Sequence, residues 1–311
     1  KSLMRFKCIS KCWCTLINSP SFVAKHLNNS VEKKLSSSTC IFLSRSQARV
    51  FPDNSWKPEV FWSIINLSID NDEHNLHYGV ENLNIPFPLE GHDFVQIDGY
   101  CNGIVCVIAG KNLRLINVLL CNPATGEFKQ LPLSCLLITS SPKGKFQLET
   151  VFGGLGFGYD CKAKEYKVVQ IIENCEYSDD QRYYYYRIAL PHTAEVYTRA
   201  ANSWREIKID ISSRTYHCSC SVYLKGFCYW FATDGDKYIL SFDLGDEIFH
   251  RIQLPCMRES NFKFSNLFLY NETIASFCSC CDPSDENSTL SEIWVMDDYD
   301  GGNSSWTKHL T

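Results

Sequence analysis

The sequence lacks long apolar runs. No stretch approaches the ~18 uninterrupted apolar residues of a membrane-spanning helix, and the start lacks the apolar segment of a signal peptide. Hydrophobic residues nevertheless make up 45% of the chain and charged residues 21%, which excludes wholesale disorder. We therefore expect a folded cytoplasmic protein with no membrane partner.

A disulfide framework is also lacking. The 17 cysteines are odd in number and scattered through apolar segments such as 100–106 and 226–230. This pattern predicts reduced thiols that act as small buried hydrophobes in a reducing compartment. Cys278 and Cys281 form a C-x-x-C pair, but no second ligand pair follows at zinc-binding spacing, so we expect no metal.

Catalytic motifs are missing too. The chain has no G-x-S-x-G, H-E-x-x-H or calcium-loop sequence. Residues 153–158 are glycine-rich but do not match G-x-G-x-x-G, and a strand-like run follows, so tight turns and close backbone approach explain them better. His74 and His77 near the acidic residues 70–73 could form a metal or acid–base site, although a solvated loop is favoured. We predict neither enzymatic activity nor a cofactor.

Charge is distributed unevenly along the chain. Residues 1–34 carry seven basic side chains against one acidic, a net charge of +6, whereas the remainder carries 23 against 34, a net charge of −11. The basic charges form no continuous run, so nucleic acid is not an expected partner. A basic head on an acidic body suits two different partners.

The basic head has a helical pattern. Apolar residues recur at helical spacing from residue 3 to residue 17, while lysines and an arginine face elsewhere. Ser19 and Pro20 predict the end of one helix and the capped start of a second. From the pattern alone, this head could also be a plain helical cap on the body.

After about Leu35 the helical period gives way to short strand-like runs between turn clusters, which predicts a mainly β domain. A degenerate unit, an apolar run followed by a polar turn and a large aromatic, recurs with the aromatic at Phe128, Tyr166, Trp204, Phe249 and Trp306. This spacing favours four-stranded propeller blades, with the aromatic covering the gap to a neighbouring blade. A β-sandwich remains the alternative.

These segments resemble known plant families. Residues 1–17 resemble the second half of a plant F-box, and residues 122–126, 156–160, 165–169 and 225–230 resemble the F-box-associated domain. The segments 22–27, 78–88 and 293–300 are most similar to the S-locus F-box group, especially its "brother" type in apple-like plants.

The resemblance implies two domains: residues 1–34 as the C-terminal part of an F-box whose N-terminus is missing, and 35–311 as a propeller-like substrate-recognition domain. It implies a non-catalytic substrate-recognition subunit of an SCF-type E3 ubiquitin ligase, with an Skp adaptor and a cullin as partners. It further implies a pollen determinant of gametophytic self-incompatibility that targets non-self S-locus ribonucleases. The expected adaptor-binding residues are Leu3, Phe6, Ile9, Trp13 and Leu16, together with the basic Lys7 and Lys11.

Substrate recognition is expected on a loop at residues 173–186, where four acids precede four tyrosines. Acidic side chains steer a basic ribonuclease, and tyrosines anchor it. The candidate substrate-binding residues are Glu173, Glu176, Asp179, Asp180, Tyr183 and Tyr185. Alternatively, half of the tyrosines face the core from a strand.

The competing function is a propeller-like enzyme, or a ligand- or glycan-binding module, unrelated to self-incompatibility. In that case the helical head merely caps the body, and polar groups converge in a pocket.

Overall fold

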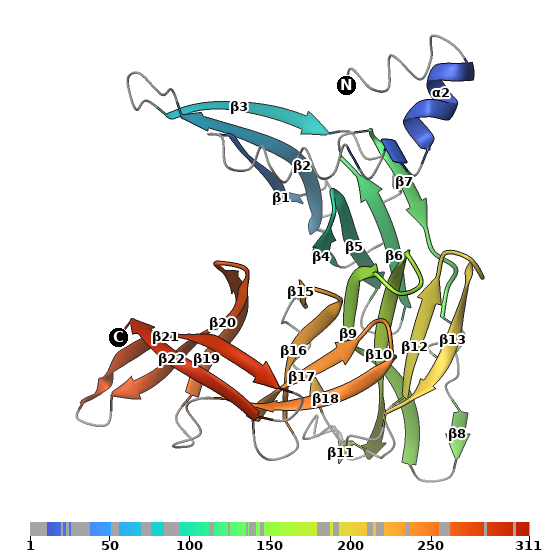
Figure 1. Cartoon of the computed structure of the whole chain (residues 1–311). Helices are drawn as coiled ribbons and strands as arrows, with labels where there is room; N and C mark the ends of the chain where they lie inside the picture. Colours follow the sequence, from blue (N-terminus) through green and yellow to red (C-terminus); the bar gives the residue numbers. More distant parts are fainter. Residues whose placement is uncertain are drawn as a thin grey trace.

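Strands dominate the described part of the chain in the computed structural model (Figure 1), and helix α2 (Lys11–Asn18) precedes them. The structure describes residues 11–19, 21–22, 25, 38–50, 56–69, 76–83, 94–111, 115–123, 125–134, 136, 141–143, 146–178, 187–188, 193–209, 214–215, 221–233, 237–254, 262–282, 285–300 and 303–310. The boundary expected at residues 34 and 35 falls outside these ranges and stays a prediction. No described helix is long and apolar enough to span a membrane.

The described strands form five antiparallel sheets, each built from one continuous stretch of sequence. The first contains β1 (Ser38–Val50), β2 (Trp56–Ile69) and β3 (Leu76–Leu83). The second contains β4 (Phe94–Cys101), β5 (Ile104–Lys111), β6 (Leu115–Asn122) and β7 (Glu127–Gln130). The third contains β8 (Ser141–Lys143), β9 (Phe146–Asp160), β10 (Glu165–Ser178), β11 (Arg187–Ile188), β12 (Thr193–Thr198) and β13 (Ser203–Lys208).

The fourth sheet contains β14 (Arg214–Thr215), β15 (Val222–Leu224), β16 (Phe227–Thr233), β17 (Lys237–Asp243) and β18 (Ile248–Gln253). The fifth contains β19 (Phe262–Tyr270), β20 (Thr273–Asp282), β21 (Asp285–Asp300) and β22 (Asn303–Leu310). Five sheets that follow one another in chain order confirm the propeller-like prediction. The β-sandwich alternative is wrong, because a sandwich packs only two sheets.

Four buried apolar clusters lie between successive sheets, one at each junction from the first sheet to the fifth. Strand β16 shows how one strand serves two junctions: Cys228 and Trp230 pack towards the third sheet, whereas Tyr229 and Phe231 pack towards the fifth. This alternation follows from the two-residue period of a β-strand. Strands buried on both faces therefore read as continuous apolar runs.

The glycine-rich segment 153–158 lies in β9 and brings the third sheet close to the fourth. Gly153 is the unpaired residue of a bulge opposite Ile171 and Ile172. A Cβ atom at Gly156 would lie 2.5 Å from Trp230, and one at Gly158 would lie 2.2 Å from Tyr223. Close approach between sheets therefore explains these glycines, as predicted. The tight turns that were also expected there are wrong, because the segment lies within β9.

Three tryptophans tie the third, fourth and fifth sheets each to the segment or sheet before it. The indole N–H of Trp204 donates to the carbonyl of Pro132 at 2.6 Å, and that of Trp306 donates to the carbonyl of Gln253 at 3.1 Å. On an inner strand, Trp230 donates to the carbonyl of Leu155 at 2.9 Å. These bonds pair backbone groups that the sheet ladders leave free and so link the sheets with defined geometry.

The aromatic repeat is confirmed at four positions and wrong at the fifth. Phe128, Trp204, Phe249 and Trp306 occupy the last strands of the second to fifth sheets, β7, β13, β18 and β22. Tyr166 instead lies in β10, within the third sheet. Its turn resembles the others because every tight hairpin uses similar residues, whichever strands it joins.

The cysteines follow the prediction where the structure describes their side chains. Cys101, Cys106, Cys121 and Cys228 are buried free thiols, Cys278 is buried as well, and Cys161 is an exposed free thiol. Burial raises the pKa of the Cys101 thiol to about 12, so the side chain stays neutral and packs as a small hydrophobe.

Candidate functional site

Helix α2 carries the described part of the predicted adaptor-binding segment. Leu16 is 50% exposed, whereas its neighbour Ile17 is buried. Lys11 is exposed, and Trp13 lies within the helix. Leu3, Phe6, Lys7 and Ile9 lie outside the described residues. Among the side chains of this segment that the structure describes, Leu16 is an apolar one that is available to a partner.

Ser19 ends α2 and caps the turn that follows. Its hydroxyl donates to the carbonyl of Leu16 at 2.7 Å and accepts the backbone N–H of Phe22 at 3.3 Å. Both bonds satisfy groups that a helix end leaves unpaired. The predicted stop and restart at this serine is therefore confirmed.

The segment predicted as a recognition loop is partly strand. Residues 173–178 belong to β10, and Glu176 lies opposite Arg187 of β11. Glu173 is only 2% exposed, so its assignment to a substrate-binding loop is wrong. The strand continues because the apolar run before it pairs with β9 along its whole length. Asp179, Asp180, Tyr183 and Tyr185 lie outside the described residues and stay predictions.

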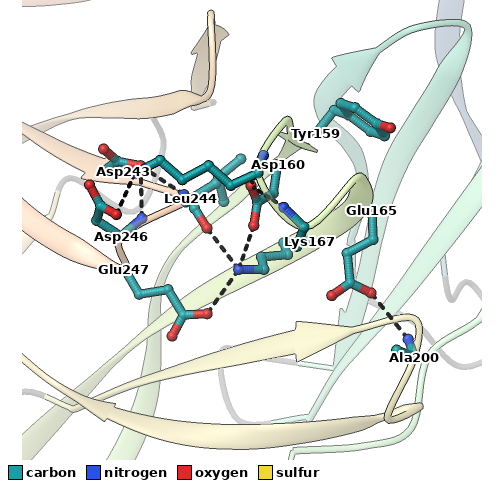
Figure 2. A network of polar contacts seen from close by, with 12 residues as sticks. Tyr159, Asp160, Glu165, Lys167, Ala200, Asp243, Leu244, Asp246 and Glu247 are labelled. Atoms are coloured by element: carbon teal, nitrogen blue, oxygen red, sulfur yellow. Dashed lines mark hydrogen bonds and ion pairs between the residues drawn. The ribbon is translucent and has the colours of Figure 1, made fainter.

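A buried ion-pair network joins the third and fourth sheets (Figure 2). The Lys167 Nζ lies 2.8 Å from Asp160 Oδ2 and 2.9 Å from Glu247 Oε1, and it donates to the carbonyl of Leu244 at 2.8 Å. Arg205 reaches the second oxygen of Glu247 at 2.6 Å. One ammonium group thus satisfies three acceptors from two sheets, so the charge is buried with its partners in place.

The network shifts the ionisation of its members. Burial would raise the pKa of Asp160, but hydrogen bonds from Lys167 and from the backbone N–H groups of Lys162 and Ala163 outweigh it and lower the pKa. Burial would also raise the pKa of Glu247, but Arg205 and Lys167 lower it. Each carboxylate therefore stays charged in the folded protein.

Exposed contacts surround the network. Lys162 pairs with Asp246, and Glu165 accepts the backbone N–H of Ala200 at 3.2 Å.

Sequence reasoning missed the whole ion-pair network, because Lys167 and Glu247 lie 80 residues apart. The only local signal is a lysine within the apolar run of β10.

A second buried acid lies in the second sheet. Asp98 is the unpaired residue of a bulge in β4, and its Oδ2 has no hydrogen-bond partner in the part of the chain that the structure describes. Burial raises its pKa to about 7, and a hydrogen bond with Gln96 offsets only part of this shift. Its backbone carbonyl accepts the Ser221 hydroxyl at 3.1 Å, which links the second sheet to the fourth.

Metal-ligating side chains do not gather in the described part of the chain. No group of three or more His, Cys, Asp or Glu is placed there to hold a metal. His77 lies in β3, and His74 falls outside the described residues.

The profile of one protein family, the F-box associated beta propeller domain, matches residues 59–311. The chain belongs to this family. The match covers all described strands except β1 and the first residues of β2. The F-box-associated propeller thus accounts for the second to fifth sheets in full and for part of the first, while α2 lies before the matched region.

Named relatives agree with this assignment. The chain is 25% identical over 312 residues to the Arabidopsis thaliana F-box protein At5g10340. This alignment covers 96% of this chain and 63% of that protein. It is 29% identical over 259 residues to the putative F-box protein At3g52320 of the same plant, and this alignment covers 82% of this chain and 56% of that protein. The chain therefore spans only part of the length of these relatives.

Among solved structures, an α-L-arabinofuranosidase from Clostridium thermocellum aligns with 88% of this chain and 90% of its own, at 13% identity and a TM-score of 0.39. A likeness this low supports no inference about activity.

Proposed function

We propose that the protein is a substrate receptor of an SCF-type E3 ubiquitin ligase. The observation that carries this proposal is the half-exposed Leu16 on a helix that precedes an F-box-associated propeller. The helix segment would dock on an Skp adaptor, which binds the cullin, and the propeller would hold the target.

The receptor acts by proximity. A bound target raises the effective concentration of its lysines near the ubiquitin thioester, which another subunit carries. The chain itself then needs no nucleophile and no cofactor, and we expect the complex to work in the cytoplasm.

Pull-down of the full-length protein with an Skp adaptor and a cullin tests this role. We expect Leu16→Glu to reduce adaptor recovery at least tenfold, because a carboxylate would be buried without a partner in the interface. Leu269→Glu is the matched control, because Leu269 in the fifth sheet is 51% exposed. Failure of the unmodified protein to recover the adaptor, or equal recovery with both variants, contradicts the proposal.

The finer proposal is that the target is an S-locus ribonuclease and that the protein is a pollen determinant of self-incompatibility. It is supported by the S-locus-like segments 22–27, 78–88 and 293–300 and by the net charge of −11 after residue 34, which favours a basic target. Binding to a panel of S-locus ribonucleases tests it. We expect Asp179→Asn with Asp180→Asn to weaken binding, and binding of no ribonuclease contradicts this target.

A further inference from the structure

Tyrosines from three sheets meet around the turn that joins β9 and β10. The rings of Tyr159 and Tyr166 lie 5.1 Å apart, edge to face. Tyr223 of the fourth sheet donates its hydroxyl to the carbonyl of Tyr159 at 3.0 Å. Tyr100 and Asn102 of the second sheet lie close enough to Tyr166 to influence its ionisation. We call these four tyrosines the tyrosine cluster.

The cluster is accessible and separate from the ion-pair network. Tyr100 is 56% exposed, and Tyr159, Tyr166 and Tyr223 are half-buried. Figure 2 shows the ring of Tyr159 pointing away from Lys167 and its carboxylate partners. The rings of Tyr159, Tyr166 and Tyr223 thus pack against the core between the second and third sheets, and Tyr100 is the member of the cluster that is exposed to solvent.

Two lysines border the cluster in backbone conformations that disfavour them. Lys164, in the turn before Tyr166, has a φ of 57°, and Lys225, two residues after Tyr223, has a φ of 48°. This left-handed region is uncommon for side chains other than glycine, asparagine and aspartate. Both lysines are exposed, and neither pairs with an acidic side chain among the described residues.

The turn between β4 and β5 in the second sheet has the residue that this backbone conformation prefers. There Asn102 has a φ of 50° and precedes Gly103, a pair favoured in tight hairpins. In the fourth sheet Lys225 precedes Gly226 at the equivalent place, although asparagine would suit the turn better. Residues in strained backbone conformations of this kind concentrate at functional sites, such as ligand-binding surfaces.

We propose that the tyrosine cluster, with Lys164 and Lys225, is a docking surface for the protein target, and that it takes a patch in which carboxylates surround an apolar side chain. This inference rests on the proposed receptor role but not on the identity of the target. Tyrosine is one of the side chains enriched among interface anchors, because it combines a large apolar area with a polar tip and few rotatable bonds. The two ammonium groups supply charge complementarity to the surrounding carboxylates.

The test uses fluorescein-labelled peptides and the full-length protein. One peptide alternates glutamate with leucine and phenylalanine, a second replaces every glutamate by lysine, and a third replaces the apolar residues by serine. We expect the first peptide to bind most tightly and to lose affinity as salt rises. Carbodiimide coupling, which joins carboxylates to amines, should link it to Lys164 or Lys225.

The variants separate docking from folding. Lys164→Asn with Lys225→Asn places asparagine in both left-handed turns, so the fold should keep its stability while peptide affinity falls about fivefold to tenfold. Tyr100→Ala should have a similar effect. Arg199→Ala, in the β12–β13 turn, and Tyr78→Ala, in the first sheet, remove an exposed arginine and an exposed tyrosine elsewhere and should leave affinity unchanged.

Three results would overturn the inference: equal binding of the lysine peptide, unchanged affinity in the double variant, or coupling that maps elsewhere. The adaptor pull-down, repeated on the double variant, separates this inference from the receptor role. If the adaptor binds but the peptide does not map to the cluster, only the docking surface is wrong. Loss of the adaptor from the unmodified protein removes the receptor role itself.

Discussion

The first and fourth sheets are built from similar apolar strands but differ in what covers them. In the fourth sheet, β16 and β17 are buried on both faces, between the third and fifth sheets. In the first sheet, one face packs on the second sheet through Trp62, while the other exposes four large apolar side chains by 40% to 73%. These are Ile41, Phe61, Tyr78 and Val80. Neighbouring sheets, rather than composition, therefore decide burial in this propeller.

The two sheets also differ in how completely their polar groups are paired. The buried indole N–H of Trp230 in the fourth sheet donates to the carbonyl of Leu155, whereas that of Trp62 in the first sheet has no partner among the described residues. An unpaired buried donor costs about 1 to 3 kcal/mol. The junction between the first and second sheets should accordingly be weaker than the junction between the third and fourth.

The largest expected difference concerns buried charge. Lys167→Met should lower the free energy of unfolding by about 3 to 5 kcal/mol, because it leaves Asp160 and Glu247 without their shared cation. Arg45→Met in the first sheet removes only hydrogen bonds to the neutral Ser63 and Asn82 and should cost less than about 1 kcal/mol. Urea unfolding measures both changes, and equal losses would contradict the comparison.

The same ion pairs should make stability depend on pH. The pKa of Asp160 is lower in the folded protein than in the unfolded chain. Its contribution to the free energy of unfolding is therefore fully present above the unfolded pKa and is lost as pH falls through the folded pKa. Unmodified protein should therefore lose stability below about pH 4, and Lys167→Met should lose less. A parallel loss in both proteins would show that other carboxylates control acid unfolding.

A smaller difference is expected at glycine positions. Gly158→Ala places a Cβ against the ring of Tyr223 and should destabilise the protein by about 1 to 3 kcal/mol. Gly79→Ala in the first sheet meets no atom within 4 Å and should change stability by about 0.5 kcal/mol or less. Thermal unfolding followed by circular dichroism compares the two, and a neutral effect at Gly158 would contradict the close approach of the sheets.

The smallest expected difference isolates one hydrogen bond. Trp230→Phe should cost about 1 to 2 kcal/mol more than Trp62→Phe, because only the first change leaves a carbonyl, that of Leu155, without its donor. Both changes remove similar apolar volume, so the excess measures the bond. Equal costs in denaturant unfolding would show that indole donors do not distinguish the two junctions.

Local patterns predicted the local features well. Strand-rich composition and the cap at Ser19 depend on neighbouring residues, and the structure confirms them. The close approach at the glycines of β9 is also confirmed, although the side chains that they meet lie in the fourth sheet. The position of Glu173 was wrong because its burial depends on β10 extending along β9. The ion pair between Lys167 and Glu247 could not be predicted, because it spans 80 residues and two sheets. Tertiary contacts of this kind leave no periodic signal in one sequence.

Because each sheet is a single uninterrupted segment, synthesis on the ribosome delivers the sheets one at a time. A sheet can complete its own ladder before the next emerges and then serve as the template on which that next sheet condenses. Partial chains would consequently carry one freshly exposed apolar face at their growing end. That face, rather than any hidden core, is where a molecular chaperone would have to bind during translation.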